Sequence, residues 1–160
     1  MTAGGLKRGK GETVKYTQAT QGRVFVVRLE DGEVLHEKIE EFAAAMGVKA
    51  AALLAVGGAD RGSTLVVGPE QGNALPVVPM ERVLGGVHEI AGTGTIFPDE
   101  SGKPVLHMHV ACGRKDSAVA GCVRRGVKVW RTVELVLFEL ACPSARRVYD
   151  EAVGFSMLEP

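Results

Sequence analysis

Aromatic residues, cysteines and long apolar runs are all scarce in this chain, and each scarcity excludes a class of protein. The aromatic content is 5%, too low to supply the stacking platforms on which proteins bind single-stranded nucleic acid. Three cysteines, an odd number, do not make a disulfide framework, and we expect Cys112 and Cys142 to be small buried hydrophobic side chains. No apolar run approaches the length of a membrane span, and residues 1–11 lack the apolar segment of a secretory signal. These absences predict a cytoplasmic protein with no membrane partner.

An excess of charge of either sign is also missing. The chain has 19 basic and 19 acidic residues, so its net charge gives no sign of a nucleic-acid binder. The charges are unevenly spread, however. The stretch from Glu30 to Glu41 holds six acids and one lysine, whereas the stretch from Arg114 to Arg131 holds six basic residues and one acid. We therefore expect a molecule with an acidic side and a basic side.

The hydrophobic content, 46% of 160 residues, is enough for the core of one domain. Residues 1–18 are polar and glycine-rich, which predicts a flexible segment. An apolar stripe beginning at Leu35 and ending at Met46 has the spacing of an amphipathic helix, and Gly47 is placed to end it.

Short β-branched or apolar runs predict the strands, and the run 132–140 is apolar on both faces, which predicts a central strand. Gly92 and Gly94 indicate a bend or a close approach of two backbones. The predicted strands cover residues 23–29, 50–56, 63–67, 87–97, 104–112 and 132–140, with a loop over 68–80. Together, the predicted strands and helix indicate an α+β domain with a mainly antiparallel β-sheet flanked by helices.

The segment His107-Met108-His109 carries the clearest hint of chemistry. It lies within a predicted strand, where side chains two residues apart point the same way, so both imidazoles project from one face. Cys122 follows after a short loop and could be a third ligand, which gives the donor set of a zinc site with an open fourth position. The alternative is a hydrogen-bonded histidine pair at a subunit contact, with Cys122 a buried hydrophobic side chain.

Basic residues surround this motif in the sequence. They could bind a phosphate, a carboxylate or a nucleic-acid backbone, or they could form a solvated face that balances the acidic helix. The candidates for anion binding are Arg114, Lys115, Arg124, Arg125 and Arg131.

Two carboxylates are candidate catalytic bases. Glu134 lies within the apolar strand 132–140, where we expect it to be paired or to have a raised pKa. It could orient a ligating histidine, act as a general base, or bond to a group across a subunit boundary. Glu89 follows His88 on another predicted strand and is a weaker candidate.

The order and spacing of several segments resemble those of the plants and prokaryotes conserved domain, abbreviated PPC. The resemblance covers about residues 20–142. It implies a PPC-like domain over residues 19–142, with residues 143–160 as a C-terminal extension packed on it. The matching segments are Gly22–Leu29, Gly32–Val34, Ile39–Ala43, Ala51–Gly58, Lys103–His109, Gly121–Cys122 and Gly126–Glu134.

The family resemblance implies an antiparallel sheet and a homotrimer. Plant members carry AT-hook motifs, whereas prokaryotic members are usually the lone domain, and several have His-x-His followed by Gly-Gly-His and look able to bind zinc. This chain has His107 and His109 but replaces Gly-Gly-His by Ala120-Gly121-Cys122. It has no Arg-Gly-Arg-Pro core of an AT-hook, and Lys7–Lys10 does not replace one.

Three functions remain open from the sequence. The first is a homotrimeric PPC-like protein that binds zinc through His107, His109 and Cys122, beside a basic patch for an anionic small molecule or DNA. The second is a zinc-dependent enzyme acting on a small anionic substrate, with Glu134 or Glu89 as base. The third is a DNA-associated regulatory module without chemistry.

Overall fold

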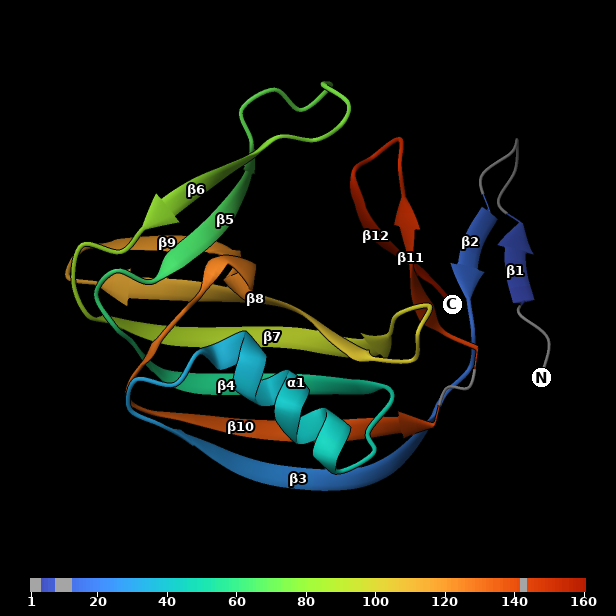
Figure 1. The fold of residues 1–160 in the computed structure, drawn as a ribbon, viewed down its shortest axis with the longest axis horizontal. Coiled ribbons are helices and arrows are strands. Elements are labelled where there is room, and N and C mark those ends of the chain that lie inside the picture. The colour runs from blue at the N-terminus through green and yellow to red at the C-terminus, as the bar shows by residue number, and fades with distance from the viewer. Residues whose placement is uncertain (1–3, 8–12, 142–143) are drawn as a thin grey trace.

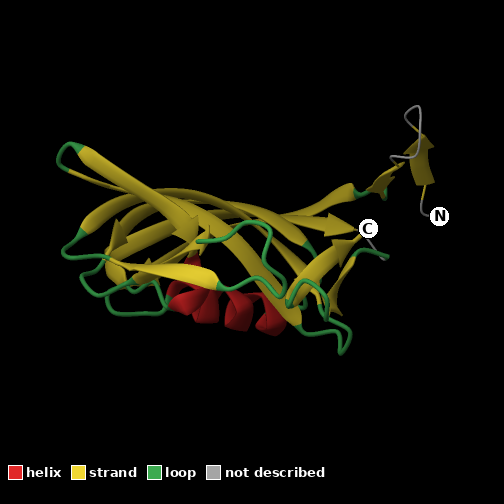
Figure 2. Cartoon of the chain, turned by 90° about the horizontal axis from the view of Figure 1, so that it is seen from above, coloured by secondary structure: helices red, strands yellow, loops and turns green. Residues whose placement is uncertain are grey.

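An eight-stranded antiparallel sheet forms the centre of the computed structural model, which describes residues 4–7, 13–141 and 144–160. The strand order is β3-β10-β4-β7-β8-β9-β5-β6, and α1 packs against one face (Figures 1 and 2). The elements are β3 (Thr20–Glu30), α1 (Leu35–Ala45), β4 (Ala51–Ala59), β5 (Thr64–Pro69), β6 (Pro79–Val83), β7 (His88–Pro98), β8 (Pro104–Arg114), β9 (Ser117–Cys122), the short 3₁₀ helix η1 (Val123–Arg125) and β10 (Val129–Ala141). The expected single domain with an antiparallel sheet is confirmed, although only one α-helix occurs among the described residues.

Two small hairpins accompany the main sheet. Strands β1 (Gly4–Lys7) and β2 (Thr13–Tyr16) pair within the segment that was expected to be flexible. Strands β11 (Arg146–Asp150) and β12 (Phe155–Glu159) form the C-terminal hairpin. Ala145, which precedes this hairpin, packs with Ala50 and Phe97 in a small apolar cluster. No helix in the described part of the chain is long and apolar enough to cross a membrane.

Strands β6 and β9 were not predicted. Every residue of β6 is exposed, and it begins inside the segment expected to be a loop. An exposed edge strand has no buried face, so it lacks the apolar alternation by which a strand is recognised. Half of strand β9 is alanine or glycine, whose β propensity is low. Both strands therefore depend on pairing with β5 and β8.

The two faces of the main sheet differ. Leu35, Ile39 and Ala43 of α1 are buried in the core on one face. The opposite face, called the outer face below, carries large apolar side chains in contact with solvent. Val26 is 84% exposed and Leu54 is 55% exposed. Strand β10 lies between β3 and β4 as expected, but only one of its two apolar faces is covered.

The glycines of β7 let β8 approach closely. A Cβ atom on Gly94 would lie 2.7 Å from the Cβ atom of Met108, and one on Gly92 would lie 2.7 Å from the carbonyl oxygen of His109. Real Cβ atoms do not come this close to a neighbour, so β7 needs glycine at both positions. The expectation of a close backbone approach is confirmed, and it fixes the backbone of the strand that carries the histidines.

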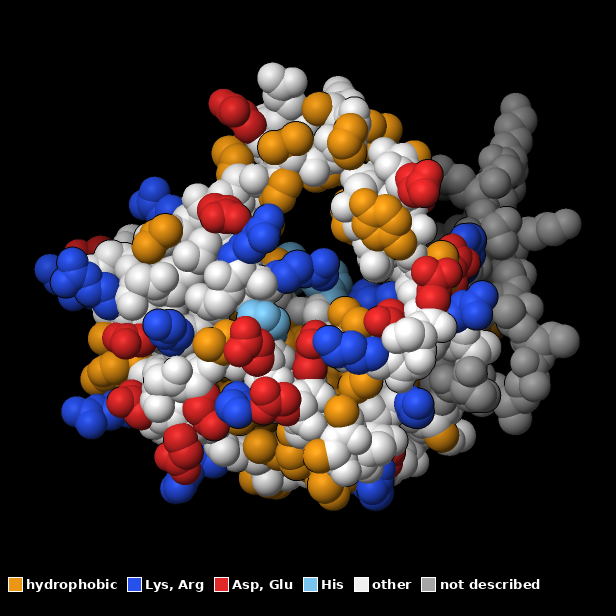
Figure 3. Space-filling model, in the orientation of Figure 1, with side chains coloured by type: hydrophobic (Ala, Val, Ile, Leu, Met, Phe, Trp, Pro, Cys, Tyr) orange, Lys and Arg blue, Asp and Glu red, His pale blue; other side chains and the backbone are white. Residues whose placement is uncertain are grey.

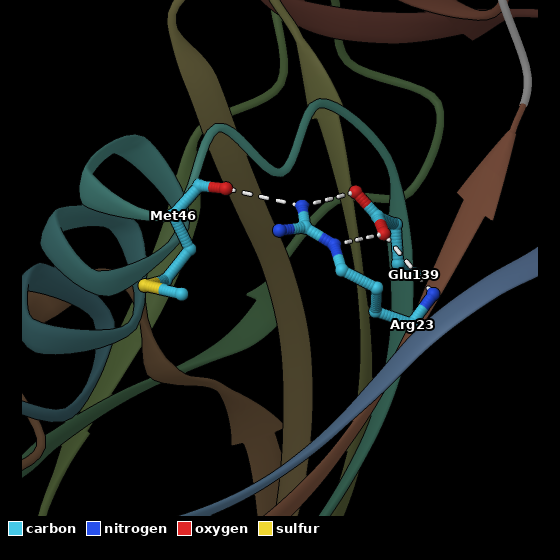
Figure 4. Close-up of polar contacts among 3 residues, drawn as sticks. All are labelled: Arg23, Met46 and Glu139. Carbon is cyan, nitrogen blue, oxygen red and sulfur yellow. Dashed lines mark hydrogen bonds and ion pairs between the residues drawn. The ribbon is translucent and has the colours of Figure 1, made fainter.

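Arg23 ties the edge strand β3 to β10 and to the end of α1 (Figure 4). Its guanidinium donates two hydrogen bonds of 2.7 Å to the Glu139 carboxylate and one of 3.0 Å to the carbonyl oxygen of Met46. A positive charge is favourable at a helix C-terminus, where the last carbonyl groups lack helical partners. These hydrogen bonds from Arg23 lower the pKa of Glu139 from 4.5 to about 2.

We expect the Glu139→Gln variant to be less stable than the parent chain at pH 7, and the difference to shrink on acidification. The folded pKa is depressed, so the stabilisation is complete above the unfolded pKa of 4.5 and is lost as the pH falls toward about 2. Urea unfolding of both chains between pH 7 and pH 2 measures this difference. A difference that stays constant across this range would contradict the prediction.

Candidate metal site

The side chains of strand β8 alternate between the core and the outer face, where the candidate site lies. Leu106, Met108 and Val110 are buried, whereas His107 and His109 are exposed on the outer face. The alternation of a strand therefore places both imidazoles on one face, as expected. Their Nε2 atoms lie 3.1 Å apart, and the ring planes are inclined by 74°.

Cys122 reaches the histidines through the register of the β8–β9 hairpin. It lies directly opposite His109 and also pairs with Val66 of β5. The preceding Gly121 permits this pairing, because a Cβ atom there would lie 2.5 Å from the carbonyl oxygen of Val66. Cys122 is buried, with 9% of its surface exposed. The three predicted ligands therefore meet on one face of the sheet.

The donor atoms have a spacing that fits a metal ion. One donor atom from each of His107, His109 and Cys122 lies within 4.8 Å of the others. Ligands on a tetrahedral zinc ion have bonds of about 2.1 Å to nitrogen, which places two nitrogen donors about 3.4 Å apart. The observed Nε2 separation of 3.1 Å is close to this value. No carboxylate joins the cluster among the described residues, so the arrangement offers three donors.

The surroundings of His107 favour neutral imidazole, the form that binds metal. The pKa of His107 lies below its ordinary value of 6.5, chiefly because burial disfavours the imidazolium and then because of the positive charges of Arg147, His109 and Arg124. Cys112 differs from Cys122: it faces the core, is fully buried, and burial raises its pKa to about 11. The prediction for Cys112 is confirmed, whereas Cys142 lies outside the described residues.

The five basic residues proposed from the sequence fall into two groups. Arg124 and Arg125 of η1 lie at the histidine and cysteine cluster, and Arg125 also forms an ion pair of 2.9 Å with Glu81. The other group lies near Trp130: Arg114 and Lys115 line a separate hollow with it, and the Arg131 guanidinium is 5.9 Å from its ring centre. The structure therefore does not join the five residues into one patch.

The two candidate bases lie away from the metal ligands. Glu134 is exposed on the outer face of β10, opposite Arg28 and Val56, and it forms no ion pair among the described residues, so the partner expected for it is absent there. It was expected because β10 is apolar on both faces, but one of these faces is open. Strands β4 and β7 separate it from β8, a distance of about 14 Å at ordinary strand spacing.

Glu89 also lies far from the histidines. It is four residues along β7 from Thr93, the residue opposite His109, and six from Thr95, the residue opposite His107, so the positions are about 14 Å and about 20 Å apart. Its side chain lines the same hollow as Arg114, Lys115 and Trp130. Neither carboxylate is placed to act as a base on a ligand of the metal cluster.

A hollow of about 600 Å³ opens beside His109 and Cys122. Strands β5 and β6 and the loop that joins them are called the β5–β6 lobe below. In Figure 3 the hollow lies between this lobe and the C-terminal hairpin, with basic side chains at its border and histidine within it. The lobe and the hairpin are joined by a hydrogen bond from the Val77 amide to the Val153 carbonyl oxygen, 3.0 Å long. The remaining lining is Val66, Gly68, Pro69, Val77, Pro79, Arg124, Arg125, Gly154 and Phe155.

Sequence reasoning missed Arg147. It lies in the C-terminal hairpin, is 5% exposed, and donates a hydrogen bond of 3.1 Å to Thr95, the neighbour of His107. Its place in the sequence, beside Arg146 in a stretch with no recognised motif, gave no signal that one of the two arginines is buried.

Comparisons with known proteins agree with this architecture. The model of the Plants and Prokaryotes Conserved domain family matches residues 16–141. The crystal structure of a metal-containing protein from Archaeoglobus fulgidus superposes with a TM-score of 0.77 at 25% identity, covering 90% of this chain and 98% of that one. No curated protein matches the sequence significantly.

Two more distant structures share the fold. A plant- and prokaryote-conserved protein from Pyrococcus horikoshii has a TM-score of 0.75 at 20% identity, covering 89% of this chain and 96% of that one. A candidate DNA-binding protein from Bacteroides thetaiotaomicron has a TM-score of 0.70 at 17% identity, covering 89% and 97%.

Proposed function

The chain belongs to the Plants and Prokaryotes Conserved domain family, and on that premise we propose that it binds a zinc-type divalent metal through His107, His109 and Cys122. The observation that carries the proposal is the convergence of three donor atoms within 4.8 Å of one another. The metal-containing description of the Archaeoglobus fulgidus protein supports it. Zinc suits two imidazoles and one thiolate better than magnesium or calcium, which prefer oxygen.

Zinc bound by three protein ligands would keep one coordination position for water or for an anion. The chain itself would hold the imidazoles by the β8 backbone and the thiolate by the β8–β9 register. Because Glu134 and Glu89 lie far from this position, we propose metal-dependent binding rather than hydrolysis. A cytoplasmic location remains part of the proposal.

We favour an anionic small molecule over a DNA backbone as the partner of this site. Arg124 and Arg125 border a hollow of about 600 Å³, the size of a pocket for a small ligand. A DNA backbone would need a continuous basic stripe, and the basic residues are divided between two places. The net charge of zero also gives little long-range attraction for DNA.

We propose that the chain assembles as a homotrimer through the outer face of its sheet. One row of directly opposed side chains crosses this face. The row consists of Val26, Val136, Leu54, Thr93, His109 and Cys122. Its first half is apolar, with Val26 and Leu54 exposed and Val136 partly exposed, which is typical of a contact surface, and its second half ends in the metal ligands. A neighbouring subunit on this face would therefore lie beside the metal site.

We expect the purified chain to bind one zinc ion per subunit and the His107→Ala variant to bind it at least about 100-fold more weakly. Removing one of three ligands leaves two donors, which hold zinc poorly. Competition with a chromophoric chelator, together with elemental analysis, measures the change. His88→Ala is the matched control, because His88 lies on β7 and its Nδ1 atom is 2.7 Å from the Gly86 carbonyl oxygen. A parent chain without stoichiometric zinc, or unchanged zinc in His107→Ala, would contradict the proposal.

A further inference from the structure

Arg147 is a buried cation without a buried anion. It is 5% exposed, and its Nε atom has no hydrogen-bond partner among the residues that the structure describes. The ion pairs found there involve other arginines and lysines. Buried guanidinium groups are normally paired with a carboxylate or phosphate, because an unpaired buried charge is strongly unfavourable. The guanidinium lies 5.9 Å from the ring centre of Phe97, a contact that offsets part of its charge, but no carboxylate pairs with it among the described residues.

Arg147 lies beside the metal cluster. Its Nη2 atom donates to Thr95, and Thr95 is directly opposite His107 on the outer face. Side chains in such a pair have their Cβ atoms about 5 Å apart. The guanidinium therefore lies beside His107. The C-terminal hairpin supplies it, and the match to the family model ends before this hairpin, at residue 141.

A second arginine faces the same place. Arg124 lines the hollow together with His109, and the Nε2 atom of His109 is 3.1 Å from that of His107. Arg147 approaches the same histidine pair from the side of Thr95. Two cations held near each other and near two imidazoles form a site for an anion.

The hollow that Arg124 lines is largely apolar, and Arg147 is not part of its lining but is linked to it through His107 and His109. Val66, Val77 and Phe155 line it, together with two prolines and glycine backbone. Arg124 lies on its wall and His109 and Cys122 lie at its base. A ligand that fills it would thus have a negative head near the arginines and a short apolar body against the lobe and the hairpin.

We propose that this hollow binds a small organic carboxylate, with Arg147 and Arg124 receiving the carboxylate and Val77 and Phe155 contacting its apolar chain. The proposal rests on the proposed function in that the carboxylate would lie beside the open coordination position of the metal. Arg147 itself stays available when the metal is absent. The carboxylate site can therefore be tested on the zinc-free chain, separately from metal binding.

Calorimetric titration with hexanoate tests the site in the zinc-free and zinc-loaded full chain. We expect hexanoate to bind the parent chain in its zinc-free form, its zinc-loaded form or both. In the Arg147→Met variant we expect the affinity for hexanoate to fall by at least about tenfold. Arg146→Met is the matched control, since Arg146 is the exposed neighbour on the same strand, and it should bind hexanoate like the parent. Arg147→Met should retain zinc and should unfold at the same temperature or higher, because the variant removes a buried charge without a partner.

Hexylammonium and hexyl phosphate, which share the apolar chain, identify the head group. Hexylammonium should not bind. Equal binding of hexylammonium, tighter binding of hexyl phosphate, or unchanged hexanoate binding in Arg147→Met would overturn the proposal. No hexanoate binding by either form of the parent chain would also overturn it, while leaving the zinc result intact. A change of oligomeric state in Arg147→Met, seen by light scattering, would assign Arg147 to a contact between subunits and would overturn it as well.

Discussion

Replacing Cys122 by serine is expected to abolish the thiolate-to-metal charge-transfer absorption of the cobalt-loaded chain. Zinc affinity should fall with it, by at least about 100-fold. The physical reason is that Cys122 supplies the thiolate, the strongest donor of the three ligands, and a serine hydroxyl is a poor ligand for zinc. Ultraviolet absorption of the cobalt-loaded chain and chelator competition for zinc measure the two effects. Because a thiol must lose its proton to bind, metal loading of the parent chain should also release protons.

Two further variants make the cysteine result specific. Cys112→Ala removes the other described cysteine, which faces the core, and should leave the absorption band unchanged. Cys122→His restores an imidazole at the same place in the β8–β9 register and should retain zinc while losing the band. A band that persists in Cys122→Ser, or that disappears in Cys112→Ala, would exclude Cys122 as the thiolate ligand.

Replacing Leu54 by aspartate is expected to dissociate the assembly. Leu54 is 55% exposed in the single chain and lies in the middle of the apolar row between Val136 and Thr93. If a second subunit covers this row, the variant buries a carboxylate without a partner, which is strongly unfavourable. Light scattering and sedimentation should show a mass that falls from three chains to one chain of 16.9 kDa.

Leu75→Asp is the matched control for the assembly. It makes the same change at a side chain that is 66% exposed in the loop between β5 and β6, which contributes no residue to the outer-face row, and it should leave the mass unchanged. A monomeric parent chain would contradict the trimer directly. A Leu54→Asp variant that keeps the parent mass would show that the assembly uses another surface.

The sequence predicted the parts of the fold in which burial leaves a periodic pattern. The stripe of α1 and the alternation of β8 both reflect a boundary between core and surface, and both are where they were expected. Strands β6 and β9 have no such pattern, because their structure depends on pairing with neighbours distant in the sequence. The sequence therefore predicted the histidine face, whereas the partner strand that brings Cys122 to it could be located only in the structure.

In the candidate site, too, the sequence predicted what local strand geometry determines and missed what depends on contacts between distant segments. His107 and His109 are near in sequence, so their common orientation follows from strand geometry alone. Arg147 reaches His107 through packing of the C-terminal hairpin on β7, and no local pattern encodes such a contact. Glu134 failed as a candidate for the opposite reason. Its apolar neighbours predicted a paired carboxylate or a raised pKa, but these neighbours belong to a sheet face that the single chain leaves open.

The alternation along β8 also limits how this protein can change during evolution. Met108 lies between the two histidines and belongs to the core, so one inserted or deleted residue within Pro104–Arg114 would turn both imidazoles inward and a core side chain outward. We therefore expect homologues to exchange residues of this strand while keeping its length. The loop between β5 and β6, which forms one wall of the hollow, carries no such restriction. We expect homologues to differ in size there, and so in the ligands that they accept, while keeping the same spacing of metal donors.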